Sequence, residues 1–227
     1  IRGMSLSGFA DPSTVAAYLG EMPMSSATST SVDIKLIDIE RVEVLKGPQG
    51  TLYGSSALSG AVRSIPVAPN LDQLEGSISV DAYAQAESDD LSQSFEGIVN
   101  IPLIDNQLAL RVAAYHHDIA GYIDAVSNPY VEARAAATGN TAYVKDDVNS
   151  SVIKGIRGSL LWQTNDNLSF NLTLGSQDSD FDGTSQTVVG AEAIDHWNTY
   201  EVSYLNRGGE EGSNLDYSNL TVDYDLG

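Results

Sequence analysis

Three aspartates at alternate positions, Asp178, Asp180 and Asp182, are the residues of this chain that are best suited to bind a metal. With Gly183 they match the first half of a calcium-binding EF-hand loop, in which oxygen ligands recur at every second position. The twelfth position is Val189 instead of the glutamate that binds calcium through both oxygens, so an EF-hand is unsupported. We therefore predict a loop that calcium could order, and the alternative is an acidic loop without a metal.

Two adjacent histidines, His116 and His117, are the other candidate metal ligands. They lie in a segment with strand-like alternation, where neighbouring side chains point to opposite faces, so they cannot share one metal ion. No serine–histidine–aspartate set and no pair of carboxylates has a spacing from which catalysis can be argued. We predict that the chain is not an enzyme and that it has no cofactor apart from the calcium considered above.

The composition excludes several classes of protein. The 227 residues include 31 acidic and 11 basic side chains, which gives a net charge of −20, and there is no cysteine. Such a chain repels the phosphates of nucleic acids and anionic lipid head groups, and it contains no disulfide or thiolate metal site. No run of about 18 apolar residues is present, so no transmembrane helix is predicted. The first residues lack a basic start followed by an apolar segment, so no signal peptide is predicted among them.

From residue 74 onward, apolar and polar residues alternate with the period of two that is typical of strands with one apolar face. In the clearest run Leu168, Phe170, Leu172 and Leu174 alternate with polar residues. Strands of about ten residues are longer than those of most soluble sheets, and they match the length that crosses a bilayer obliquely. The predicted strands cover residues 74–86, 93–103, 107–117, 154–163, 168–177 and 217–226.

The connections and the aromatic residues favour a membrane barrel. Short turns at 104–106 and 164–167 alternate with long polar stretches, as in outer-membrane barrels with periplasmic turns and external loops. Trp162, Phe170 and Tyr224 fall on the apolar face at one height, as an interfacial aromatic girdle requires. The strands of a soluble β-sandwich also alternate between apolar and polar residues, so this fold remains the alternative. It predicts that the protein can be extracted from cells without detergent.

Residues 40–65 contain two short apolar strands, 42–45 and 61–65, joined by a glycine-rich connection. Glycines allow unusual backbone angles or the close approach of another surface, and a proline fixes a turn. We predict that this segment packs tightly and does not form a catalytic loop. Its characteristic residues are Gly47, Pro48, Gly50, Tyr53, Gly54 and Gly60.

Residues 39–54, IERVEVLKGPQGTLYG, resemble the closing half of the plug domain of TonB-dependent outer-membrane receptors. The family usually has arginine where this chain has Lys46, and a double glycine where it has Ser59-Gly60. Residues 1–3 and 15–23 resemble earlier elements of the same domain, with Gly20 in place of an acidic residue. The resemblance implies the C-terminal part of a plug domain in residues 1–70 and the first strands of a barrel in residues 71–227.

The resemblance also implies a fold and a function. The fold would be mainly β. A partial plug of small mixed α+β structure would be followed by antiparallel transmembrane strands, about six of the roughly 22 that form the complete barrel. The function would be energy-coupled uptake across the bacterial outer membrane, with a ferric siderophore as the default cargo and cobalamin, haem or an oligosaccharide as alternatives. The implied partners are the TonB–ExbB–ExbD complex, the cargo and outer-membrane lipid. A passive porin or adhesin barrel is the alternative class, and it would lack a plug.

Two further expectations follow. Six strands cannot close a barrel, and neither a signal peptide nor a TonB box precedes Ile1, so we expect an internal part of a longer receptor. We also expect charged residues of the plug, Arg41, Glu43 and Lys46, to form a releasable lock with charges that face the lumen, since buried polar contacts specify position more than they stabilise. The alternative is that they are solvated surface charges. The expected partners include Glu75, Asp81, Glu96, Arg111 and Arg157.

Overall fold

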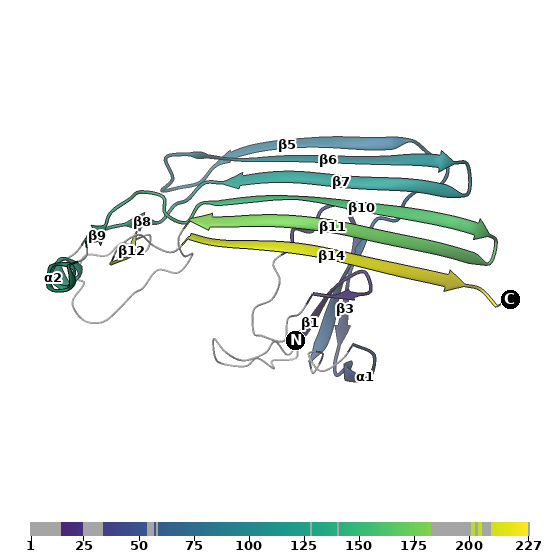
Figure 1. Cartoon of the computed structure of the whole chain (residues 1–227), viewed down its shortest axis with the longest axis horizontal. Helices are drawn as coiled ribbons and strands as arrows, with labels where there is room; N and C mark the ends of the chain where they lie inside the picture. Colours follow the sequence, from purple (N-terminus) through teal and green to yellow (C-terminus); the bar gives the residue numbers. More distant parts are fainter. Residues whose placement is uncertain are drawn as a thin grey trace.

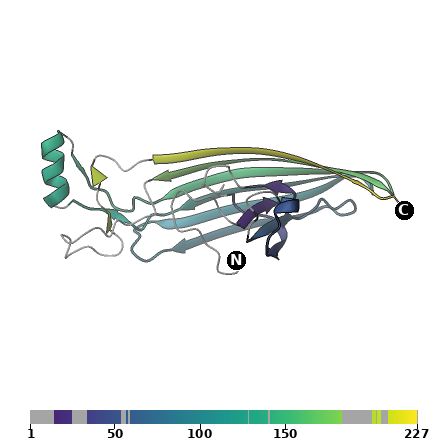
Figure 2. The same cartoon turned by 90° about the horizontal axis from the view of Figure 1, so that it is seen from below.

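A computed structural model describes residues 15–24, 34–53, 57, 59–127, 129–139, 141–182, 201–202, 204–205 and 210–226. Most of these residues form two β-sheets, a small one near the N-terminus and a long one (Figure 1). The small sheet lies against one face of the long sheet, which we call the inner face (Figure 2). Within the described part of the chain, no helix is both long and apolar enough to cross a membrane.

The long sheet has six antiparallel strands in the order β14-β11-β10-β7-β6-β5. Each predicted strand is confirmed, and most extend beyond their alternating run. The short turns lie at one end of the sheet and the long connections at the other (Figure 1). The strands are β5 (Glu75–Ala84), β6 (Leu91–Ile104), β7 (Leu108–Ile119), β10 (Ser151–Asn165), β11 (Leu168–Asp182) and β14 (Glu210–Tyr224).

The outer face of the long sheet is apolar and exposed, as the alternation predicts. On β5, Ile78 is 86% exposed. The aromatic residues expected at one height lie together at the end with the short turns. The Trp162 ring lies 5.7 Å from that of Phe170, its cross-strand partner, and Tyr224 pairs with Leu168 on the same strand as Phe170. The predicted position of this aromatic row is therefore confirmed.

The small sheet has the order β2-β1-β4-β3, in which β1 (Val15–Leu19) is parallel to β4 (Gly60–Pro66). The strand β2 (Met22–Pro23) and the strand β3 (Ile39–Lys46) are antiparallel to their neighbours. A one-turn helix, α1 (Gly50–Tyr53), lies in the connection from β3 to β4. This arrangement is the small mixed α+β structure that the resemblance implied. Its core contains the buried Ala16, Ala57 and Ala61, packed against Tyr18, Leu45 and Tyr53.

The glycine-rich connection is closed by main-chain hydrogen bonds. The Gly47 amide donates to the Ser59 carbonyl at 3.1 Å, and the Gln49 amide donates to the Ala57 carbonyl at 2.9 Å. Gly47 has a φ of 98°, which a residue with a Cβ rarely adopts, so glycine is required for this turn. Tight packing of the connection is thus confirmed here, while Gly54 lies outside the described residues.

At the far end, the two long connections contain short elements that the sequence pattern did not reveal. The strand β8 (Asp124–Ala125) pairs with β12 (Glu201–Val202), and β9 (Ala142–Tyr143) pairs with β13 (Tyr204–Leu205). The helix α2 (Pro129–Thr138) lies beside them (Figure 1). A small apolar cluster of Ile123, Ala125 and Val148 supports this end. The two connections therefore form one joined structure.

Candidate functional site: the junction between the two sheets

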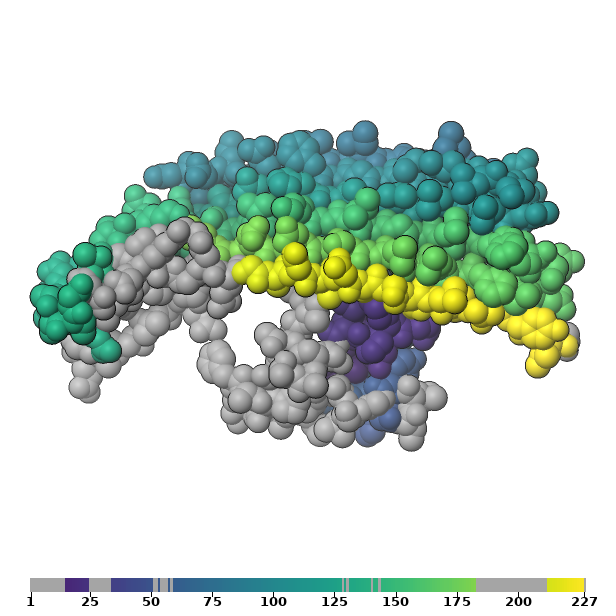
Figure 3. All heavy atoms as spheres, viewed as in Figure 1, coloured from purple at the N-terminus to yellow at the C-terminus, as the bar shows by residue number. Residues whose placement is uncertain are grey.

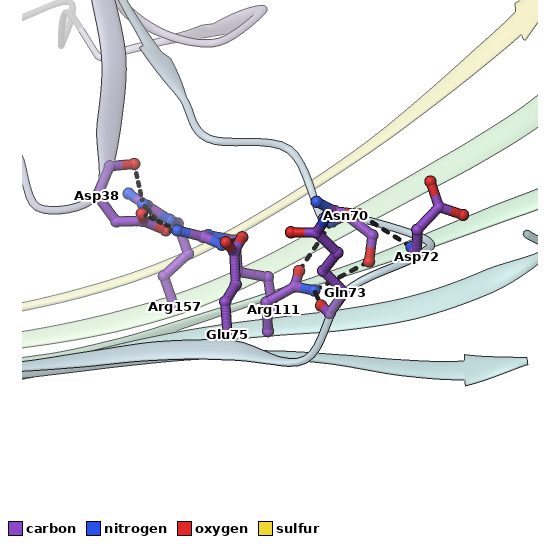
Figure 4. A network of polar contacts seen from close by, with 8 residues as sticks. Asp38, Asn70, Asp72, Gln73, Glu75, Arg111 and Arg157 are labelled. Atoms are coloured by element: carbon purple, nitrogen blue, oxygen red, sulfur yellow. Dashed lines mark hydrogen bonds and ion pairs between the residues drawn. The ribbon is translucent and has the colours of Figure 1, made fainter. Parts of the chain in front are cut away.

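The small sheet is attached to the long sheet by an ion-pair group around Asp38, a residue just before β3 (Figure 4). Arg111 on β7 holds both oxygens of the Asp38 carboxylate: Nε donates to Oδ2 at 2.7 Å and Nη2 donates to Oδ1 at 2.6 Å. The Arg157 Nη2 atom on β10 lies 3.6 Å from Oδ2. The side chain of Asp38 is only 5% exposed, that of Arg111 11% and that of Arg157 7%. The group is therefore a nearly buried charge cluster, and its geometry is bidentate.

Further contacts balance the cluster and tie it to the main chain. The Arg157 Nη2 atom donates to the carbonyls of Ile37 at 2.7 Å and Asp38 at 3.0 Å. The Arg111 Nη1 atom donates to Glu75 Oε1 at 3.1 Å. Two guanidinium groups thus face two carboxylates, and the main-chain carbonyls use remaining donors of Arg157. A buried ion pair is tolerated when its charges are matched and hydrogen-bonded in this way.

The backbone at Asp38 places its side chain for these contacts. Asp38 has a φ of 55°, and aspartate is among the few residues besides glycine that adopt this left-handed conformation readily. Its carbonyl accepts a hydrogen bond from the Val67 amide at 3.0 Å, just after β4 ends. The turn therefore lies where both β3 and β4 approach the long sheet.

A second polar contact attaches the linker between the sheets to β6. Asn100 is fully buried on the inner face, and its Oδ1 atom accepts from the Asn70 amide at 2.8 Å. Its Nδ2 atom donates to the carbonyls of Asn70 at 2.9 Å and Gln73 at 2.7 Å (Figure 4). The amide side chain thereby replaces main-chain partners that the irregular linker lacks, which satisfies buried polar groups on both sides.

Away from these contacts, a cavity of about 210 Å³ lies between the two sheets. Figure 3 shows β1 beneath the edge strand β14, and residues of both border the cavity. The small sheet and the residues just after it contribute Glu21, Glu40 and a larger set of apolar side chains: Leu19, Met22, Ile65, Pro66, Val67 and Ala68. The long sheet contributes hydroxyl, phenol and amide side chains: Ser159, Asn171, Thr173, Tyr217, Asn219 and Thr221. The cavity therefore has a largely apolar side toward the small sheet and a polar side toward the long sheet, and the cluster at Asp38 is a specific attachment beside it.

Comparison with known proteins identifies the small sheet as part of a known domain. Residues 1–61 match the family model of the TonB-dependent Receptor Plug Domain. The ferric yersiniabactin uptake receptor FyuA from Yersinia pestis has the same fold, with a TM-score of 0.69 and 21% identity over 98% of this chain and 32% of FyuA. Residues 1–61 thus belong to the plug domains of TonB-dependent receptors, and the whole chain is similar to part of such a receptor. Receptors with this plug are outer-membrane β-barrel proteins, which places the chain in the bacterial outer membrane. The family consists of transporters and not of enzymes.

Other relatives agree with this assignment. The pesticin receptors of Yersinia enterocolitica and Yersinia pestis are 35% identical over 88 residues, which is 37% of this chain and 12% of each relative. The ferric enterobactin receptor PfeA from Pseudomonas aeruginosa has a TM-score of 0.64 and 17% identity, over 95% of this chain and 31% of PfeA. The chain thus spans an eighth of the curated relatives and about a third of these structures.

The plug charges that we expected to contact the wall contact one another in the structure. Arg41 pairs with Glu40 at 2.9 Å and with Glu43 at 2.8 Å, and Glu43 also pairs with Arg63 at 2.9 Å. Lys46 is exposed and forms no ion pair among the described residues. A contact of these residues with other parts of the receptor stays a prediction. The plug residue that does bind the wall is Asp38, which the sequence analysis did not single out.

The wall charges that we expected as partners have different outcomes. Arg111 and Arg157 bind the plug directly, and Glu75 reaches the cluster through Arg111. Glu96 contacts His117 instead, with 3.1 Å between Oε1 and Nε2. Asp81 forms no ion pair within the described part of the chain. His117 thus faces inward, whereas His116 is exposed on the outer face, as the alternation predicted.

The predicted calcium loop is not a loop. Asp178, Asp180 and Asp182 lie in β11, where every second side chain points outward, so their carboxylates follow a strand and do not converge on one point. Asp178 pairs with Lys154 at 2.8 Å, and Asp182 pairs with Lys145. The described residues include no group of three histidine, cysteine, aspartate or glutamate side chains that could hold a metal ion. Val189 lies outside the described residues.

Tyr53 of the plug motif packs against Tyr18, with ring centroids 5.1 Å apart and an interplanar angle of 75°. The Tyr18 hydroxyl donates to the main-chain carbonyl of Tyr53 at 2.8 Å. Burial, together with the nearby Tyr53 and Glu21, raises the pKa of Tyr18, so the hydroxyl remains a donor at neutral pH. The Arg63 guanidinium lies 5.8 Å from the centroid of the Tyr53 ring.

We predict that Tyr53→Ala lowers the stability of the plug by about 1–3 kcal/mol, because the edge-to-face contact and part of a small core are lost. Tyr53→Phe serves as the control: it keeps the ring, and Tyr18 still bonds to the main chain, so its effect should be small. The measurement is amide hydrogen exchange in β1 and β4 of the receptor in detergent. Equal exchange in the two variants would contradict this account of the motif.

Proposed function

We propose that this chain supplies the C-terminal part of the plug, in residues 1–70, and the first barrel strands, in residues 71–227, of a receptor that takes up a ferric siderophore. The observation that carries the proposal is the buried attachment of Asp38 to Arg111 and Arg157, which joins the small sheet to the long sheet. A plug must be held in place at rest and must move when cargo passes. Charge contacts suit both requirements, because they fix position while contributing little net stability.

In this proposal the chain performs no covalent chemistry. Arg111 and Arg157 hold the plug through Asp38, and Asn100 holds the linker that follows the plug. The cavity next to them leaves the two sheets without close packing there, so fewer contacts must break when the plug rearranges. The energy for the rearrangement would come from the TonB–ExbB–ExbD complex of the inner membrane. A passive porin or an adhesin is disfavoured, because residues 1–61 match a plug domain that such barrels lack.

The names of the similar proteins support a ferric siderophore as cargo. FyuA is described as an uptake receptor for ferric yersiniabactin, and PfeA as a receptor for ferric enterobactin. A third structure, the ferripyoverdine receptor of Pseudomonas aeruginosa, has a TM-score of 0.58 and 18% identity over 90% of this chain and 25% of its own. The cargoes in these names differ, but each is an iron chelate. They favour an iron chelate over cobalamin or an oligosaccharide for this receptor.

We expect a strain that lacks the receptor to lose growth on at least one ferric siderophore when iron is limiting. The test compares uptake of radioactive iron supplied on a panel of siderophores, in the deletion strain and in the strain with the receptor restored. A strain with the receptor but without TonB is the control, and it should fail in the same way. Normal iron uptake on every chelate, together with lost growth on cobalamin or on an oligosaccharide, would overturn the proposed cargo. Uptake that persists without TonB would overturn the energy coupling.

A further inference from the structure

The plug is held along a short segment outside the strands, residues 35–38, which we call the strap. At its start, the Lys35 amide donates to Gln177 Oε1 on β11 at 2.9 Å. At its end, Arg157 on β10 donates to the carbonyls of Ile37 and Asp38. Ile37 between them is buried. Two wall side chains, Gln177 and Arg157, therefore hold the main chain of the strap from both ends.

Each of these wall side chains is contacted by a tyrosine. The Tyr115 hydroxyl donates to Gln177 Oε1 at 2.6 Å. The Tyr217 ring lies over Gly175, the cross-strand partner of Arg157, so its hydroxyl is directed toward the Arg157 side chain. Tyr115 lies on β7 and Tyr217 on β14, on opposite sides of the β10–β11 pair that carries Arg157 and Gln177. The two tyrosines thus approach the strap contacts from opposite directions.

The strand register shows how each tyrosine reaches its partner. Tyr115 is paired with Gly155, and Gly155 is paired with Gln177 on the next strand. Tyr217 is likewise paired with Gly175, and Gly175 is paired with Arg157. In both rows a tyrosine crosses a glycine on the middle strand to reach a polar side chain on the third strand.

The two glycines are necessary for this crossing. A Cβ atom on Gly155 would overlap the Tyr115 ring, and a Cβ atom on Gly175 would overlap the Tyr217 ring. Each ring therefore lies over the glycine, where any other residue would place its side chain. Neither glycine has a left-handed backbone angle, so the space above it is the structural reason for its presence.

We propose that Tyr115 and Tyr217 are positioning residues that aim Gln177 and Arg157 at the strap and thereby set how firmly the plug is held. The Tyr115 hydroxyl donates to the same Gln177 oxygen that accepts from the Lys35 amide, and it thereby fixes the rotamer of the Gln177 side chain. A hydroxyl beside Arg157 keeps the guanidinium turned toward the strap carbonyls. The inference concerns retention of the plug and does not depend on which cargo the receptor carries.

The test uses Tyr115→Phe and Tyr217→Phe in the full receptor, because phenylalanine keeps the ring over the glycine and removes only the hydroxyl. Amide hydrogen exchange is measured for the strap and for strands β10 and β11. In Tyr115→Phe we expect the exchange rate of the Lys35 amide to rise about fivefold, which is the effect of losing one hydrogen bond. In Tyr217→Phe we expect a rise of the same size across the whole strap. Exchange in β10 and β11 should stay unchanged. Tyr224→Phe, on the exposed outer face, is the matched control and should exchange as the unmodified receptor does.

A second variant separates positioning from packing. Gly175→Ala displaces the Tyr217 ring, so we expect faster exchange near Asp38 and little change at Lys35, which is held through Tyr115 instead. Strap exchange that remains unchanged in both phenylalanine variants would overturn the proposal and leave the rings as packing groups only. Faster exchange in β10 and β11 to the same extent as in the strap would also overturn it. No cargo is present in this experiment, so its outcome is separate from that of the uptake test.

Discussion

Asp38→Asn is expected to release the plug from the barrel wall more than any other single substitution at the junction. The change removes the charge that Arg111 and Arg157 share. Among the residues that the structure describes, it leaves the two nearly buried guanidinium groups with the partly exposed Glu75 as their one counter-charge. Removing one partner of a buried ion pair typically costs about 3–5 kcal/mol, because the remaining charge is left without compensation. The cost should appear as loosening of the strap and of β3.

The measurement is amide hydrogen exchange of residues 34–46 in the intact receptor, together with the sensitivity of cells to antibiotics too large for ordinary porins. Glu40→Gln is the control, because Glu40 is an exposed carboxylate that pairs with Arg41 on the plug itself. An exposed pair of this kind contributes about 0–1 kcal/mol, so this variant should differ little from the unmodified receptor. If Asp38→Asn and Glu40→Gln exchange at the same rate, the buried cluster does not hold the plug. Adding Arg111→Gln to Asp38→Asn should recover part of the loss, since it removes an uncompensated cation.

The sequence predicted the strands of the long sheet because a membrane wall imposes opposite requirements on its two faces. The alternation of Leu168, Phe170 and Leu172 with polar residues reflects lipid on one side and the plug on the other. The strand β11 nevertheless continues to Asp182, beyond the last apolar residue of the run. Main-chain hydrogen bonding between strands does not depend on side-chain polarity, so the strand can extend past the apolar band. The end of the apolar alternation therefore does not mark the end of the strand, and the three aspartates lie in β11.

The attachment of the plug could not be predicted in the same way. Arg41 and Glu43 were selected because they lie in a recognisable motif, but residues two apart on a strand share a face and can pair with each other. Asp38 is separated from Arg111 by 73 positions in the sequence and carries no local pattern. Its left-handed backbone angle, which marks it in the structure, has no distinct signature in the sequence beyond the residue type. The crossing of Tyr217 over Gly175 is likewise defined only by strand register.

Leu174→Arg is expected to destabilise the barrel strongly, because Leu174 lies at the middle of the outward apolar band of β11. It is four residues from Phe170 in the aromatic row and four residues from Asp178, where the outer face becomes polar. A charged residue at the bilayer midplane costs about 2–4 kcal/mol in such barrels, and the cost falls to about 0–1 kcal/mol near the interfaces. The measurement is a urea titration of the complete receptor folding into phospholipid vesicles.

The control is Leu226→Arg, which introduces the same charge two residues beyond Tyr224 of the aromatic row. Leu226 is 86% exposed and lies past the end of β14, where a guanidinium reaches water, so this variant should unfold close to the unmodified receptor. The difference between the two variants isolates the effect of depth in the membrane, since both exchange an exposed leucine for arginine. Equal midpoints for both would mean that the outer face of β11 does not contact lipid, and the transmembrane reading of the six strands would then fail. A large difference would fix the membrane boundary between Leu174 and the short-turn end of the sheet.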